Sequence, residues 1–176
     1  MTLRDLEAAL PALREFRLPV PRGIDWSRIE RELGLRPPAD FMELSEHYSL
    51  LVLDEFLSVH IPDPGTEEEF ISVAGEFLSD LDSLRAAGMS HGYVPHPADG
   101  GLFPWADSVE GDTWYWKTGG PDPDTWPVVV SGHNDDWFEV DAGLTAYLAG
   151  LVRGTIPPDG LPPDFPGRTP TVEAQL

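Results

Sequence analysis

The stretch GLFPWADSVEGDTWYWKTGGPDPDTWPVVVSGHNDDWFEVD, residues 101–141, decides the fold of this chain. It contains four short runs, at residues 101–108, 112–118, 126–132 and 136–141, that are rich in tryptophan, valine and tyrosine, which favour β-strands. The sequences between the runs, Glu-Gly-Asp, Gly-Gly-Pro-Asp-Pro-Asp and Gly-His-Asn-Asp, are typical of turns. Because these gaps are short, we expect consecutive strands to pair antiparallel as a meander.

Upstream of the meander, apolar residues recur at helical spacing. A first helix is expected to begin at Thr2 and to break or kink at Pro11. A second is marked by Asp25 as its N-cap and by Gly34 at its end. A third is expected within PPADFMELSEHYS, residues 37–49, because the prolines set its entry and aromatic and leucine residues form one stripe.

Three further elements complete the pattern. Residues 50–62 are apolar and partly β-branched and end at a Pro-Asp-Pro-Gly turn, which indicates one bent strand or a pair of strands. A long helix is expected from Thr66 to Gly88, with a capping box and three glutamates over the positive end of its dipole. A last helix is expected to use Asp141 as its cap and to end near Gly154.

This succession of elements predicts an α+β fold with a curved, mostly antiparallel sheet flanked by helices. The 176 residues suffice for one hydrophobic core. We divide the chain into an N-terminal helical extension, residues 1–24, an α+β domain, residues 25–154, and a proline-rich tail, residues 155–176. The tail shows no periodicity, so we expect it to be mobile or to form an extended strap.

Composition and charge exclude several classes of protein. The absence of cysteine excludes disulfide frameworks, thiolate zinc sites and cysteine nucleophiles. Neither an apolar run of membrane-spanning length nor a signal peptide is visible, so a cytoplasmic protein is expected. The formal net charge of -20 repels phosphate backbones and anionic lipids, so nucleic acid and membranes are not expected partners. The excess lies between Pro37 and Val152, where 22 residues are acidic and two are basic.

Two histidine-containing segments could hold a ligand. His91, His96 and Asp99 resemble a metal-ligand cluster, but the same residues suit a polar loop, and zinc needs three or four convergent ligands. The sequence His133-Asn-Asp-Asp is equally explained as a hairpin turn. No phosphate-binding glycine loop, nucleophile elbow or EF-hand spacing is present, so no cofactor or metal is expected.

The acidic residues and tryptophans of the meander leave a second possibility open. Carboxylate pairs at glycosidase-like separation are numerous, so no single pair is specific. The acids concerned are Asp107, Glu110, Asp112, Asp122, Asp124, Asp135 and Asp136. Tryptophans beside them either line a sugar groove or belong to the core. These tryptophans are Trp105, Trp114, Trp116, Trp126 and Trp137.

Two stretches of the chain resemble the SUKH superfamily, the proteins similar to the Smi/Knr cell-wall-assembly regulator. The first is IERELGLRPPADFMELSEHYSLLVLDEFLSVHIP, residues 29–62, and the second comprises residues 100–130 and 136–154. The first stretch contains the helix entry, and the second contains the Pro-Trp, the Gly-Asp turn, the aromatic strand and the Trp-Pro. Taken together, their order is similar to that of the family. The matching positions, which we expect to be structural, are Leu35, Pro38, Asp40, Phe41, Pro104, Trp105, Gly111, Asp112, Trp116, Trp126 and Pro127.

The resemblance implies a domain without catalytic apparatus, used in bacteria chiefly as an immunity protein that binds and neutralises a cognate toxin. Some relatives are regulators or adaptors instead. Many toxins that cut nucleic acid are basic, so an acidic surface would steer the encounter, and we expect a basic partner such as a nuclease-type toxin domain. The acids expected to contact it are Asp122, Asp124, Asp135, Asp136, Glu67 and Glu68.

Three alternatives stay open at this point. A regulatory or adaptor scaffold would differ only in its partner. A carbohydrate-binding or hydrolytic site would use the tryptophans and aspartates of the meander. The charge could also serve only solubility. The sequence leaves the oligomeric state undetermined.

Overall fold

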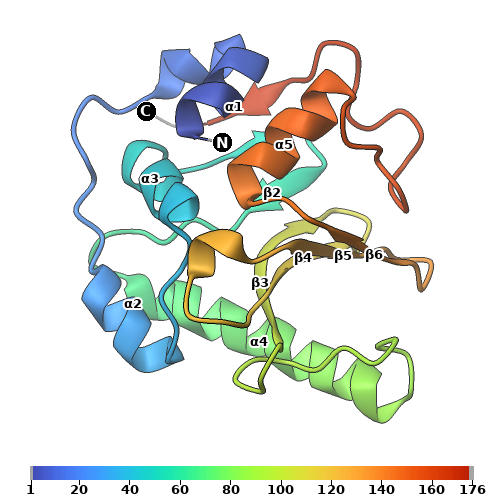
Figure 1. Cartoon of the computed structure of the whole chain (residues 1–176). Coiled ribbons are helices and arrows are strands. Elements are labelled where there is room, and N and C mark those ends of the chain that lie inside the picture. Colours follow the sequence, from blue (N-terminus) through green and yellow to red (C-terminus); the bar gives the residue numbers. More distant parts are fainter. Residues whose placement is uncertain (1, 175–176) are drawn as a thin grey trace.

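The computed structural model of the chain describes residues 2–174 and has an α+β fold built on a seven-stranded antiparallel sheet (Figure 1). Its strand order is β6-β5-β4-β3-β2-β1-β7. The last four strands before the C-terminal helix form the expected meander: β3 (Leu102–Ser108), β4 (Thr113–Lys117), β5 (Val128–Ser131) and β6 (Trp137–Val140). Each pairs antiparallel with the next, which confirms the α+β class and the flanked sheet.

Residues 50–62 form a pair of short strands, β1 (Val52–Leu53) and β2 (Leu57–Val59). The turn between them places Asp54 at a φ of 52°. A further strand, β7 (Val172–Glu173), pairs with β1 and forms one edge of the sheet. The sequence pattern did not predict β7, because its two residues carry no alternation of their own.

Most helix boundaries follow local sequence. The side chain of Asp25 accepts a hydrogen bond from the Arg28 N–H at 2.9 Å, and Gly34 ends the same helix at a φ of 68°. The helical elements are α1 (Leu3–Ala9), η1 (Pro11–Phe16), α2 (Trp26–Leu33), α3 (Ala39–His47), α4 (Glu67–Ala86), η2 (Pro123–Thr125) and α5 (Leu144–Arg153).

Two expected helix caps are wrong. The Thr66 side chain makes no capping hydrogen bond to α4, whose N-terminal residue Glu67 instead bonds to main-chain groups before it. At α5 the N-cap is Gly143 and not Asp141. A free N–H in the first turn of that helix is satisfied from α3, because the Asp40 carboxylate accepts hydrogen bonds from both the main-chain N–H and the hydroxyl of Thr145 at 2.9 Å.

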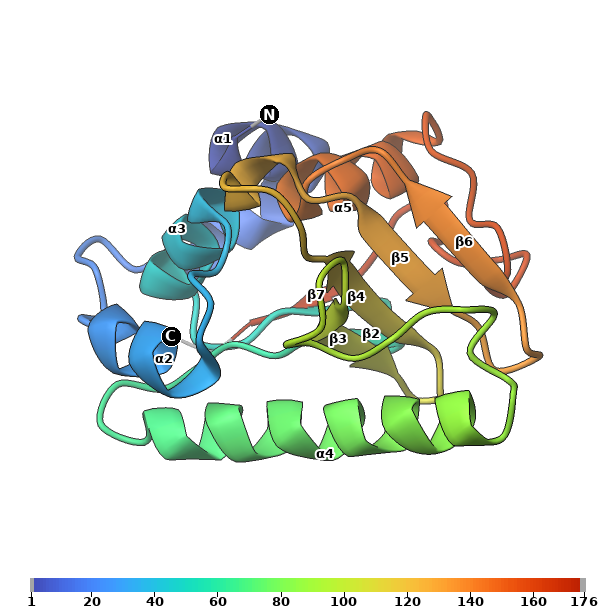
Figure 2. The same ribbon diagram turned by 60° about the horizontal axis from the view of Figure 1, so that its bottom comes forward.

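Helices cover both faces of the sheet (Figure 2). On one face α1, α3 and α5 enclose an aromatic core in which Trp105, Trp114 and Trp116 are fully buried, and the Trp114 indole N–H donates to the Tyr147 hydroxyl at 2.9 Å. On the other face α4 runs across the sheet, and its Leu81 packs against residues of β3, β4 and β5. No helix within residues 2–174 has the length and apolar character that crossing a membrane requires.

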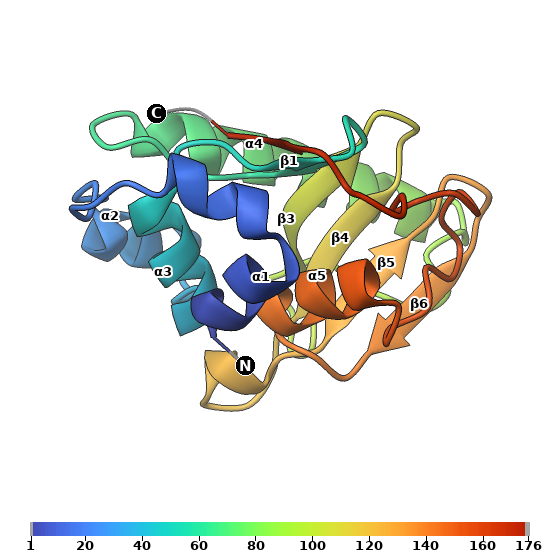
Figure 3. The same cartoon turned by 90° about the horizontal axis from the view of Figure 1, so that it is seen from above.

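The N-terminal segment contributes to the same core. α1 packs beside α5 (Figure 3), and its Leu3 and Leu6 are fully buried. The buried carboxylate of Glu7 accepts a hydrogen bond from the Tyr48 hydroxyl at 2.9 Å and pairs with Arg17. Residues 2–24 are therefore integrated into the α+β domain.

The C-terminal tail lies along the domain as an extended strap. Phe165 is 5% exposed, and its ring centroid lies 4.6 Å from that of Phe56. The Asp54 carboxylate accepts hydrogen bonds from the N–H groups of Gly167 and Thr171 at 2.7 and 2.6 Å. One carboxylate in the β1–β2 turn thus holds the strap just before β7.

We expect the Asp54→Gly substitution to release this strap while leaving the domain folded. Glycine tolerates the positive φ at this position, so the variant loses the carboxylate without backbone strain. Limited trypsin digestion is expected to cleave after the exposed Arg168 several-fold faster than in the wild type. Asp164→Ala, at an exposed carboxylate of the strap, is the control, and equal cleavage of both variants would contradict the role of Asp54.

Candidate functional site

The residues expected to dock a partner are distributed over three places, and some of them already have structural partners. Glu67 is 3% exposed, and its carboxylate accepts hydrogen bonds from the N–H groups of Asp25 at 2.9 Å and Gly65 at 3.2 Å. These bonds, the one from Asp25 above all, lower the pKa of the Glu67 carboxyl. Glu68 is exposed and pairs with Arg28 at 2.8 Å. Glu67 therefore joins α4 to the start of α2 and is not available to a partner.

Asp122 is the N-cap of η2 and Asp124 lies within it, and η2 is on the opposite side of the sheet from α4 (Figure 2). The Asp122 side chain accepts from the Asp124 N–H at 3.1 Å, and the Asp124 carboxylate accepts from the Ala39 N–H at 2.6 Å. Ala39 is the first residue of α3, so Asp124 satisfies a free N–H at a helix N-terminus. The hydrogen bond from Ala39 to Asp124 therefore joins η2 to the start of α3.

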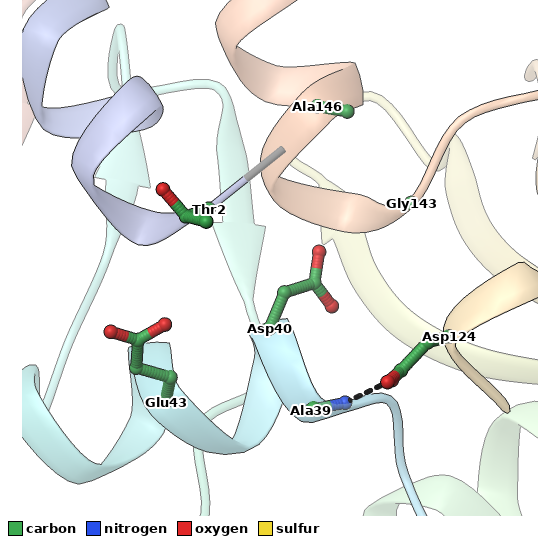
Figure 4. A pocket seen from close by; sticks show the side chains of 7 residues that line it. All are labelled: Thr2, Ala39, Asp40, Glu43, Asp124, Gly143 and Ala146. Atoms are coloured by element: carbon green, nitrogen blue, oxygen red, sulfur yellow. Dashed lines mark hydrogen bonds between the residues drawn. The ribbon is translucent and has the colours of Figure 1, made fainter.

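Asp124 also lines an acidic cavity of about 310 Å³ where η2, α3 and α5 meet (Figure 4). Asp40 and Glu43 line it from α3, and no basic side chain is among its lining residues. Two of the three carboxylates bond N–H groups at the first turns of α3 and α5, where a negative charge complements the helix dipole. The acidity of this cavity is thus largely accounted for by helix capping.

Asp135 and Asp136 lie in the β5–β6 hairpin, close to the C-terminal end of α4. Asp135 has a φ of 63°, and its carboxylate is 3.2 Å from the His91 imidazole. The hairpin and α4 enclose a cavity of about 270 Å³ that includes Trp137 and Leu84. This confirms the turn expected at His133-Asn-Asp-Asp and brings it beside His91.

A buried carboxylate anchors the same hairpin. Asp112 is fully buried and accepts hydrogen bonds from the Ser108 hydroxyl, from the His133 N–H at 2.9 Å and from the ring Nδ1 of His133 at 2.9 Å. The bond to Asp112, followed by the charges of Asp112, Glu110 and Asp136, raises the pKa of His133. The folded state therefore binds the His133 proton more tightly than the unfolded state does.

We expect the stabilising effect of His133 to weaken as the pH rises. Because the folded-state pKa lies above the unfolded value of about 6.5, the contribution is complete below that value and is lost as the pH passes through the folded pKa. Urea midpoints measured from pH 5.5 to 8.5 for the wild type and His133→Gln test this. The difference between the two is expected to shrink with rising pH, and a constant or growing difference would contradict the pairing.

The candidate metal cluster does not assemble. His96 Nε2 is 2.8 Å from the Leu33 carbonyl oxygen, whereas His91 faces Asp135, so the two rings and Asp99 do not converge. Within residues 2–174, no group of three or more histidine, aspartate or glutamate side chains is placed to hold a metal ion.

Nor do the tryptophans line an open groove. Trp105, Trp114 and Trp116 are fully buried and Trp126 is 7% exposed, which leaves Trp137 as the partly exposed one. The four buried indoles belong to the core on one face of the sheet. This agrees with the interpretation of these tryptophans as core residues.

The residues that carry the family resemblance occupy structural positions. Phe41 and Trp116 meet edge to face at 5.0 Å between α3 and β4. Gly111 has a φ of 95° in the β3–β4 turn, a conformation that favours glycine. The buried members of the set are Leu35, Pro38, Phe41, Pro104, Trp105, Asp112, Trp116 and Trp126, and Pro127 is partly buried.

A group of acids that the sequence analysis did not single out lies along the exposed side of α4. Glu69, Glu76 and Asp80 are exposed, and spacings of seven and four residues place them on one helix face. Within residues 2–174 their carboxylates make no hydrogen bond or ion pair. We call these three residues the acidic band, which spans about 16 Å of helix. Their spacing was visible in the sequence, but Glu69 was interpreted only as one of three glutamates over the helix dipole, and Glu76 and Asp80 were given no role.

An apolar groove adjoins the acidic band. It lies between β2 and α4, has a volume of about 270 Å³, and is lined by Val59 and Phe70, both buried. Val73, 38% exposed, also lines it, and the exposed acids Asp63 and Glu69 border it. We call it the α4 groove. An apolar centre with a charged margin is the usual composition of a protein interface.

Comparison of the chain with family models, with curated proteins and with solved structures finds no match.

Proposed function

We propose that this chain is a non-enzymatic protein-binding domain that binds a basic partner through the acidic band and the α4 groove. The observation that supports this most is the combination of an apolar groove and three adjacent exposed carboxylates that have no hydrogen-bond or ion-pair partner in the described part of the chain. Most other acids discussed above already serve a helix terminus, a turn or an ion pair. The acidic band has no such structural role among the described residues.

The two parts of this surface would do different things. The acidic band would accelerate encounter with a positively charged protein, because opposite charges steer diffusion and their effect weakens with salt. The α4 groove would retain the partner, because a few well-packed contacts in a desolvated pocket near the centre of an interface carry most of the binding energy. Val73, placed between the carboxylates of the band, fits the position of such a centre.

The resemblance to the SUKH superfamily supports a more specific form of this proposal. In that form the chain is a cytoplasmic immunity protein, and the basic partner is a toxin domain of nuclease type. A regulatory or adaptor scaffold would use the same surface for another basic protein. A carbohydrate-binding or hydrolytic site has less support, because the tryptophans of the meander are largely in the core.

Co-expression tests the proposal. The chain is produced together with the polypeptide encoded by the neighbouring gene, and growth is compared with and without it. The immunity form predicts that the neighbour alone stops growth, that co-expression restores growth, and that the two proteins purify as a complex. Persistent growth arrest while both proteins accumulate in folded form would contradict the immunity form.

A further inference from the structure

One edge of the sheet is open. The sheet ends at β7 on one side and at β6 on the other. β7 has only two residues, whereas β6 has four and pairs with β5 in a regular register without a bulge. β6 is therefore the longer and more regular of the two edges.

The pairing with β5 defines which peptide groups of β6 point outward. The Gly132 N–H donates to the Asp136 carbonyl at 2.7 Å, and hydrogen-bonded pairs alternate along an antiparallel ladder. Phe138 therefore turns its N–H and C=O toward β5, and Trp137 and Glu139 turn theirs to the open edge. Outside the β5–β6 ladder, no main-chain hydrogen bond within the described range 2–174 involves Trp137 or Glu139.

We propose that the outer edge of β6 receives an extended basic segment of the partner protein, which adds to the sheet as an eighth strand. Such strand addition gives main-chain hydrogen bonds for affinity and alternate side chains for specificity. This inference rests on the proposed function, and it names the second contact surface and the conformation of the segment that binds there.

The charge of the β6 edge favours a basic segment over a second copy of this chain. Residues 133–141 contain Asp135, Asp136, Glu139 and Asp141 and no lysine or arginine. Glu139 pairs with Lys117 of β4 at 2.8 Å and Asp135 lies 3.2 Å from His91, whereas Asp136 and Asp141 make no ion pair within residues 2–174. Two copies of β6 would bring these acids close to each other, and like charges across strands are destabilising. A basic segment would meet Asp136 and Asp141 as opposite charges instead. β6 also lacks the proline, lysine or bulge with which proteins commonly protect an edge strand.

The edge is continuous with the α4 side of the molecule. The Trp137 ring stacks on Tyr93 at 5.1 Å and on Tyr115 at 6.3 Å, and Tyr115 packs against Leu81 of α4. Trp137 is partly exposed, so side chains of an added strand would pack beside this aromatic group. One partner could therefore contact α4 and extend a strand along β6.

Amide hydrogen exchange tests the edge directly in the full chain. The probe is an acetylated, amidated octapeptide of alternating lysine and valine, and the charge control is the same peptide with glutamate in place of lysine. The lysine peptide is expected to slow exchange of the Trp137 and Glu139 amides by about tenfold or more, and the glutamate peptide to leave them unchanged. Binding without protection of these two amides, or no binding at millimolar peptide, would overturn the inference.

A matched pair of variants isolates the main-chain contribution. Glu139→Ala and Glu139→Pro both remove the carboxylate, but only the second removes the outward N–H, and proline is tolerated at an edge where the N–H faces solvent. The proline variant is expected to bind the lysine peptide about tenfold more weakly than the alanine variant. Equal affinities in two variants with wild-type circular dichroism would contradict strand addition.

The same variants separate this inference from the proposed function. If the neighbouring gene product binds Glu139→Ala and Glu139→Pro equally well, the edge is not used and the proposed function stands. If it does not bind the wild type at all, the immunity form of the proposed function fails, whatever the peptide does.

Discussion

Reversal of the acidic band by Glu69→Lys, Glu76→Lys and Asp80→Lys together is expected to weaken binding of the basic partner at least about a hundredfold. Close charge pairs across an interface couple by roughly 1.5 kcal/mol or more, and a tenfold change in affinity corresponds to about 1.4 kcal/mol. The fold is expected to persist, because the three side chains are exposed and make no hydrogen bond or ion pair within residues 2–174. Isothermal titration calorimetry at two salt concentrations measures the effect.

A second triple reversal controls for net charge. Glu15→Lys, Glu55→Lys and Asp164→Lys change the total charge equally at exposed positions away from α4. This variant is expected to lose only about threefold in affinity, through the weaker long-range field. If both triple variants lose the same affinity, binding depends on overall charge and the acidic band has no special role.

Arg22→Ala is expected to lower the free energy of unfolding by roughly 3–4 kcal/mol, because hydrogen bonds from a charged donor contribute about 1.5–3 kcal/mol each and are not fully additive. The Arg22 side chain is 8% exposed and pairs with Asp63. Its Nη1 donates to the carbonyl oxygens of Ser45 and Tyr48 at 3.2 Å and of Pro62 at 3.0 Å. Removal leaves these acceptors at the junction of α3 and the β2–α4 loop without their charged donor. Urea denaturation measures the loss.

Two further variants make the Arg22 result specific. Arg22→Lys keeps the charge but lacks the planar fork, so it is expected to recover only part of the stability. Arg4→Ala, at an exposed arginine of α1, is expected to change the free energy of unfolding by about 0.5 kcal/mol or less. A loss for Arg22→Ala no larger than that for Arg4→Ala would show that the buried guanidinium does not hold this junction.

The meander and most helix ends were predictable because their determinants are local. Trp114 and Trp116 lie two residues apart in one strand, and the Gly-Asp turn before them fixes where that strand begins. The wrong or missed elements are those in which the hydrogen-bond partner is distant in sequence. Asp141 has the right position to cap α5, but Asp40, remote in sequence, bonds Thr145 instead. β7 was missed for the same reason, since its pairing with β1 is a tertiary contact.

The docking residues were harder to predict than the fold. Glu67 and Glu69 are the same residue type in the same helical turn, yet one is buried against the start of α2 and the other is exposed. Asp124 similarly has a hydrogen-bond partner in α3, 85 residues away. Sequence spacing shows which acids share a helix face, but it does not show which acids already have a partner in the fold.

Carboxylate labelling tests the central claim most directly. Exposed carboxylates are modified by carbodiimide and glycine ethyl ester in the free chain and in its complex with the neighbouring gene product, and the modified positions are quantified by mass spectrometry. Binding through α4 predicts that Glu69, Glu76 and Asp80 lose most of their labelling in the complex while Asp122 is labelled equally in both states. Unchanged labelling of the acidic band, together with protection of Asp122, would contradict it.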